Sequence, residues 1–172
     1  MRLSILLLLT ALPFFGICQG KKGYFSTSLG LNFAKMMDPA VGGHISGNAM
    51  FAPGCFTGLE LGFVKFQGMD GIYMPLQLKI TVMPGKDPSK ISPIAFLQPG
   101  YGVYNKTAKV SNTAVTTTQG GFVFFGGAGL AFGSQGKGRM FLALGYSRFG
   151  FTINDRSSPV DMVSVRTGVM LQ

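Results

Sequence analysis

The sequence lacks tryptophan, and it has one histidine, two cysteines and only 6 acidic residues among 172. A cleavage after Cys18, argued below, would leave Cys55 alone, which excludes an internal disulfide and disfavours a disulfide-stapled secreted module. Cys55 lies in a turn-like stretch and is interpreted as a spectator thiol. One histidine with scattered acids provides no metal-ligand cluster, so we expect neither a metal nor a cofactor.

Charge of either sign is also scarce, because charged residues make up 12% of the chain. A soluble globular domain would normally carry about twice that share. Without Arg2, 14 basic residues face 6 acidic ones, so the mature net charge is near +8. The basic residues fall mostly in expected turns and do not cluster with exposed aromatics. We therefore expect no nucleic-acid partner, and interpret these turns as contacts with anionic lipid headgroups or as plain solvated turns.

The one long apolar run lies at the start of the chain, at residues 3–15, behind the positive charge of Arg2. It is short for a bilayer span, which needs about 20 residues. Gly16 and Cys18 place small residues at −3 and −1 of a cut before Gln19. The pattern predicts a signal peptide at 1–18 and a barrel domain at 19–172. An uncleaved anchor is one alternative, and a lipoprotein is another, although Ile17 occupies a site where a lipobox prefers a small residue.

After the leader, apolar residues alternate with polar or small ones in eight stretches, each near the 9–11 residues of a transmembrane strand. In the first stretch, for example, Leu29 and Leu31 share one face and Gly30 lies on the other. The eight stretches are residues 24–34, 41–51, 56–66, 72–83, 91–104, 121–132, 140–149 and 162–171. Pro93 and Pro99 make the fifth irregular, since proline favours an edge, a bulge or an end. The pattern predicts an all-β, eight-stranded antiparallel up-and-down transmembrane β-barrel.

The charges within these stretches support this interpretation. Glu60, Lys79 and Arg166 each fall on the polar phase of their strand. Facing lipid at mid-depth would cost about 2–4 kcal/mol for an arginine or lysine, whereas a polar lumen offers partners. We therefore predict a lumen network in which Glu60 pairs with Lys79 and Arg166 lies nearby. Eight strands leave an interior just wide enough for side chains, so we expect a largely filled lumen.

The connections are expected to alternate in length, with short turns at 52–55 and 133–139 and longer links at 35–40, 105–120 and 152–159. The stretch 105–120 is predicted to be the longest loop and the main external surface for contact with a partner. Without tryptophan, the interfacial aromatic girdle must come from phenylalanine and tyrosine. Our candidates are Tyr24, Phe33, Phe66, Tyr73, Tyr101, Tyr104 and Phe149.

Four segments carry a resemblance to a known group: GYFS at 23–26, MPLQLK at 74–79, LALGYS at 142–147 and VSVRTG at 163–168. Through them the chain resembles the small outer-membrane β-barrel proteins, often grouped as porin-family or outer-membrane β-barrel domain proteins. The resemblance implies an eight-stranded barrel with a filled interior in the cell outer membrane. It also implies outer-membrane lipid and the barrel assembly machinery as partners. The surface partner stays unknown.

Three functions are open at this point. The first is a structural or surface-interaction protein of the outer membrane, without enzymatic activity. The second is a soluble lipocalin-like barrel that binds an apolar ligand, in which the apolar phase would point inward. The third resembles the lipid-A deacylase barrels, because His44 and Ser46 share a strand face and Glu60 lies on the same phase of the next strand. In those enzymes an asparagine directly follows the serine, whereas here Gly47 intervenes before Asn48.

Overall fold

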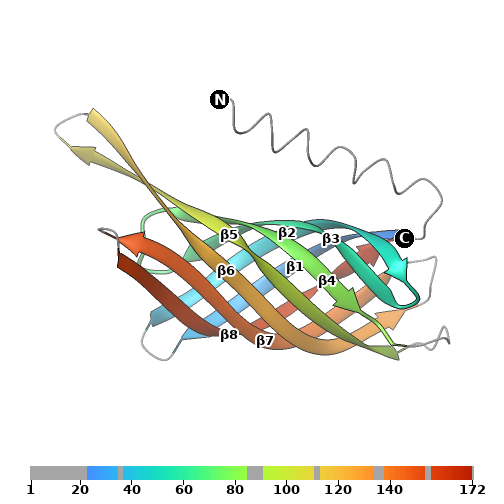
Figure 1. Cartoon of the computed structure of the whole chain (residues 1–172). Helices are drawn as coiled ribbons and strands as arrows, with labels where there is room; N and C mark the ends of the chain where they lie inside the picture. Colours follow the sequence, from blue (N-terminus) through green and yellow to red (C-terminus); the bar gives the residue numbers. More distant parts are fainter. Residues whose placement is uncertain are drawn as a thin grey trace.

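The computed structural model describes residues 23–34, 37–84, 91–110, 113–133, 138–153 and 156–171. They form a closed barrel of eight antiparallel strands in sequence order, and the last strand pairs with the first (Figure 1). The predicted all-β up-and-down barrel is therefore confirmed. Residues 1–22 lie outside the described residues, so the signal peptide at 1–18 stays a prediction.

Each strand pairs antiparallel with the next, so the chain runs around the barrel without a crossover, and the register shifts locally between Asn32 and Ala34 and between Met50 and Ala52. The strands are β1 (Gly23–Ala34), β2 (Met37–Ala52), β3 (Cys55–Phe66), β4 (Ile72–Val82), β5 (Ile91–Val110), β6 (Thr113–Gly133), β7 (Arg139–Ile153) and β8 (Arg156–Leu171). We call the end with Gly23 and Leu171 the termini end. The opposite end, where β1–β2, β3–β4, β5–β6 and β7–β8 are joined, is the hairpin end.

The barrel has its apolar phase on the outside. In β4, Gln77 and Lys79 point inward and are buried, whereas Leu76 and Leu78 are exposed on the outer wall. The same alternation recurs around the barrel, so large apolar side chains cover the outer wall and polar ones line the middle of the lumen. The soluble lipocalin-like alternative is therefore wrong, because it requires the opposite orientation. The described residues include no helix long and apolar enough to cross a membrane.

The predicted 105–120 loop is wrong, because most of this segment is strand. The β5–β6 ladder continues through Lys106 opposite Thr117 as far as Val110 opposite Thr113. This segment is rich in threonine, a residue that favours strands, and the hairpin pairs backbone groups that a loop would leave to solvent. The two strands project beyond the rest of the barrel as a ribbon (Figure 1).

The links expected at 35–40 and 152–159 are also mostly strand, since β2 begins at Met37, β7 ends at Ile153 and β8 begins at Arg156. The prolines of the fifth stretch do not end it either. Pro93 and Pro99 both lie within β5 and are paired with β6. On the side of β4, Leu97 and Gly100 are paired but the two residues between them are not, which fits the absence of an N–H on Pro99.

The predicted aromatic girdle is mostly wrong. Phe33 and Tyr101 are exposed on the outer wall, but the other five candidates are buried inside the barrel, namely Tyr24, Phe66, Tyr73, Tyr104 and Phe149. Each of these five shares its phase with inward polar residues of its own strand, as Tyr73 does with Lys79. The outer wall instead carries other exposed aromatics, namely Phe25, Phe51, Phe63, Phe122, Phe132 and Tyr146.

Candidate functional site: the sealed lumen and the projecting hairpin

The middle of the lumen holds an ion-pair network centred on Glu60 of β3. Its carboxylate accepts from Lys79 of β4 at 2.9 Å and from Arg166 of β8 at 2.7 Å. Gln98 of β5 donates at 3.2 Å to Oε2, the oxygen that also accepts from Lys79, and His44 Nδ1 of β2 lies 3.4 Å from Oε1. All five side chains are buried. The structure therefore brings Glu60 and Lys79, from the neighbouring strands β3 and β4, together with Arg166 of β8.

One carboxylate faces two cations here, so each cation needs further partners. Lys79 Nζ also donates to Ser26 and Ser46, at 3.1 Å each. Arg166 donates to Gln98 Oε1 at 2.7 Å, and its guanidinium lies 3.8 Å from the ring centroid of Phe125. Burying a charge is costly unless it is paired and hydrogen-bonded, and these contacts reduce that cost, although Arg166 Nε has no hydrogen-bond partner among the described residues.

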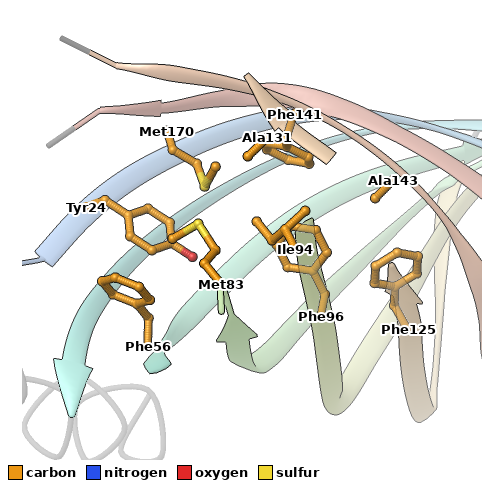
Figure 2. Close-up of a cluster of buried hydrophobic side chains, with 10 residues drawn as sticks. All are labelled: Tyr24, Phe56, Met83, Ile94, Phe96, Phe125, Ala131, Phe141, Ala143 and Met170. Carbon is orange, nitrogen blue, oxygen red and sulfur yellow. The ribbon is translucent and has the colours of Figure 1, made fainter. Parts of the chain in front are cut away.

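Apolar side chains close the lumen on the termini side of this network (Figure 2). Tyr24 packs edge-on against Phe56 with ring centroids 5.0 Å apart, and Phe96 lies 5.3 Å from Phe141. The cluster contains Tyr24, Phe56, Met83, Ile94, Phe96, Phe125, Ala131, Phe141, Ala143 and Met170. Its members come from β1, β3, β5, β6, β7 and β8, so most of the strands around the barrel contribute to it.

A second cluster closes the lumen on the hairpin side, and it contains Ala40, Val64, Phe66, Tyr73, Tyr104, Val123, Phe149, Phe151 and Met162. The Tyr73 hydroxyl donates across the lumen to the carbonyl oxygens of Gly150, at 3.3 Å, and Gly121, at 3.5 Å. Gly102 leaves the space that the Tyr73 ring occupies, since a Cβ at that position would overlap the ring. The barrel is thus plugged by aromatic side chains at both ends.

The space between the two clusters is filled as well. The cavity bordered by Glu60, Lys79, Gln98 and Arg166 has no room for a water-sized probe. A water molecule needs at least about 10–15 Å³ by this measure. The lumen therefore offers neither a continuous water path nor a substrate pocket within the described residues.

The catalytic candidates lie inside this sealed interior. His44 and Ser46 are both buried, and the Ser46 hydroxyl contacts Ser26, Asn48 and Lys79 rather than the imidazole. The His44 ring packs over Gly62, where an added Cβ would lie 2.5 Å from Nδ1. Glu60 is near His44 but is occupied by two cations. The arrangement has no base on the serine and no access for a lipid substrate. Nor do the described residues contain a group of three or more histidine, cysteine or acidic side chains able to hold a metal.

The sequence reasoning missed Gln98, which bridges Glu60 and Arg166. The signal was present, because Ser92, Phe96 and Gln98 share the inward phase of β5. The two prolines on the other phase hid this alternation. A polar residue that shares the inward phase of its strand therefore predicts a contact in the lumen, even when the strand contains proline.

The projecting hairpin is the second notable feature. β4 pairs with β5 only as far as Asn105, and β7 pairs with β6 only from Val123 onward. The β5–β6 ladder nevertheless continues to Val110 and Thr113. Among the described residues, the backbone of β6 from Thr113 to Gln119 is not paired with β7. Such an open strand edge is a template for pairing with another chain.

No family model matches the chain, and no curated protein matches it in sequence. Solved structures with the same fold are found. Neisserial surface protein A covers 87% of this chain and 94% of its own at 9% identity, with a TM-score of 0.60. The N-terminal β-barrel domain of Pseudomonas aeruginosa OprF covers 87% of this chain and 100% of its own at 14% identity, with a TM-score of 0.53. A major outer membrane protein from Thermus thermophilus covers 87% of this chain and 99% of its own at 15% identity, with a TM-score of 0.54.

At these identities the likeness concerns the fold. The outer wall adds an independent physical argument, because exposed leucine and phenylalanine around the barrel suit lipid, while the charged residues of the network are turned inward. The chain has the fold of the small bacterial outer-membrane β-barrels, and its wall is that of a barrel embedded in the outer membrane.

Proposed function

We propose that this protein is a non-enzymatic surface-interaction protein of the outer membrane, which uses its sealed barrel as an anchor and its β5–β6 hairpin as the contact element. The observation that carries the proposal is the continuation of the β5–β6 ladder beyond both neighbouring strands. A barrel that only needed to span the membrane would gain nothing from this extension. Since both ends of the lumen are plugged, transport through the barrel is not favoured.

The open edge of β6 supports a specific mode of contact, in which an extended segment of the partner adds a strand. Main-chain hydrogen bonds give affinity in such complexes. Natural edge strands are usually protected by charged residues or proline. The edge segment 113–119 reads TAVTTTQ and contains neither. We therefore infer that this edge is kept available for a partner strand.

The hairpin can be removed with the loss of an exposed ion pair to the barrel, between Lys106 and Asp70 at 4.0 Å, and this provides the test. Residues 106–117 would be replaced by Asn-Gly, which favours a two-residue hairpin turn between Asn105 and Thr118. Bacteria that display the full chain or the shortened chain would be compared for cell–cell aggregation and for retention on immobilised matrix proteins. We expect both readouts to fall to the level of cells without the barrel. Equal adhesion by the shortened chain, at equal surface amounts of folded barrel, would contradict the proposal.

A further inference from the structure

The two long edges of the projecting hairpin differ in charge. Among the described residues, β5 is not paired with β4 beyond Asn105, and β6 is not paired with β7 over residues 113–119. The β5 edge contains Lys106 and Lys109, whereas the β6 edge contains no charged residue. Lysine on an edge strand is a common protection against pairing with a further strand. One edge of the hairpin is therefore protected and the other is open.

An edge without charge can pair with the same edge of a second copy. A row of like charges on the β6 edge would repel the same row on another copy and would admit a partner of opposite charge. The segment 113–119 has no such row, so it neither selects a charged partner nor prevents the pairing of two copies. Two identical edges meet about a two-fold axis perpendicular to the strands, which makes the strands antiparallel.

The β6 edge is compatible with itself in this antiparallel arrangement. When the two-fold axis passes through Thr116, each residue of the segment faces a small or uncharged residue of the other copy. Seven residues a side then form about six to eight backbone hydrogen bonds, because alternate pairs exchange two bonds each. Threonine and valine favour strands, and threonine pairs stabilise an antiparallel ladder. The opposed residues are Thr113 and Gln119, Ala114 and Thr118, Val115 and Thr117, and Thr116 with its own copy.

The lysines of the hairpin do not oppose this pairing. In the joined ribbon, β5 and β6 of one copy are followed by β6 and β5 of the other. The two β5 strands are then three interstrand spacings of about 4.8 Å apart, or roughly 14 Å. Exposed charges are largely screened beyond about 8 Å at physiological ionic strength, so Lys106 and Lys109 of the two copies interact weakly. The same lysines protect both outer edges of the joined ribbon, so the assembly ends at two copies.

We propose that the β6 edge pairs antiparallel with the β6 edge of a second copy of this chain in a facing membrane. The inference rests on the proposed function and names the partner of the hairpin. The β5–β6 ladder continues the barrel wall, and the plane of the wall contains the barrel axis (Figure 1). A two-fold axis perpendicular to the wall reverses the barrel axis, so the two barrels point in opposite directions. Each contact is small, and many copies on each membrane supply an avidity of about 10²–10⁴.

The test uses the full-length mature barrel as the only protein in phosphatidylcholine vesicles at physiological salt, with clustering followed by light scattering. We expect vesicles with the natural barrel to cluster. Thr116→Lys and Thr116→Glu should each reduce clustering to the level of protein-free vesicles, because two like charges would lie directly opposite in the ladder. Mixing Thr116→Lys vesicles with Thr116→Glu vesicles should restore clustering, because opposite charges then face each other.

Thr107→Lys is the matched control, because Thr107 is paired with Thr116 in the same hairpin but lies on the protected β5 strand. It adds the same charge and should preserve clustering. The shortened chain, in which Asn-Gly replaces residues 106–117, should not cluster. The mobility shift between unheated and boiled samples verifies that each variant folds, and protease digestion of the hairpin verifies that equal amounts face outward.

Clustering that survives Thr116→Lys, or a mixture of the two charged variants that stays dispersed, would overturn the proposal. Dispersed vesicles of the natural barrel would also overturn it. If cells then still need the hairpin for retention on matrix proteins, the proposed function stands with a foreign partner. If cells with the shortened chain adhere and aggregate as well as those with the full chain, the proposed function itself fails.

Discussion

Neutralising Glu60 is the most informative single change in the lumen. Glu60→Gln keeps the size of the side chain but removes the negative charge that Lys79 and Arg166 share, at 2.9 and 2.7 Å. Two buried cations would then lie in a sealed interior without a counter-charge. Breaking a buried pair in this way costs about 3–5 kcal/mol. That is a large fraction of the roughly 5–15 kcal/mol that stabilises a typical folded domain.

The assay is urea unfolding of the barrel in detergent or vesicles, followed by the unheated gel shift. We expect the Glu60→Gln midpoint to fall well below that of the natural chain. Adding Lys79→Met should recover part of the loss, because the second substitution removes one of the two uncompensated cations. As a control, Asp70→Asn removes an exposed partner of Lys106 and should change stability by less than about 0.5 kcal/mol.

A loss below about 1 kcal/mol for Glu60→Gln would refute this reasoning, since a merely exposed ion pair is worth that little. Such a result would indicate that water enters the lumen and screens Lys79 and Arg166. A double variant less stable than the single one would also contradict it.

Three further predictions concern the plugs and the hairpin. Gly102→Ala should destabilise the barrel by about 1–3 kcal/mol in the same unfolding assay, because the added Cβ would overlap the Tyr73 ring. Gly47→Ala is the control and should leave the unfolding midpoint unchanged, since its Cβ meets no atom. Equal midpoints for the two variants would contradict the described packing of Tyr73. In planar bilayers the natural barrel should give no stable conductance steps, and regular steps would show that the plugs are open. Replacing 106–117 by Asn-Gly should leave the unfolding midpoint nearly unchanged, because the hairpin lies beyond the β4 and β7 ladders; a large loss would mean that it supports the barrel.

The barrel architecture could be predicted because one rule, alternation with a period of two, governs every strand. This rule also indicates the inward phase of Glu60, Lys79 and Arg166. Which inward residues meet across the lumen depends on strand register and on the circular order of the strands. The contact between Arg166 and Gln98, which are 68 residues apart, is of this kind. No local pattern in the sequence specifies it.

The errors have equally specific causes. The girdle prediction for Tyr73 rests on its residue type alone, although its phase matches that of Lys79. The period of two is the better guide, and it also places Phe66 and Phe149 inside. The long hairpin escapes the sequence reasoning because lysine and other polar residues between 105 and 120 give the segment the composition of a loop. Backbone pairing between two strand-favouring segments outweighs that compositional signal.

The central claim is that this chain is a closed barrel inserted in the outer membrane with its apolar wall toward lipid. The most direct measurement fractionates cells that express the chain and compares unheated with boiled samples of the outer-membrane fraction on a gel. The account predicts that the protein is found in that fraction and that its mobility changes on boiling. A protein found in the soluble fractions, with the same mobility before and after boiling, would contradict it.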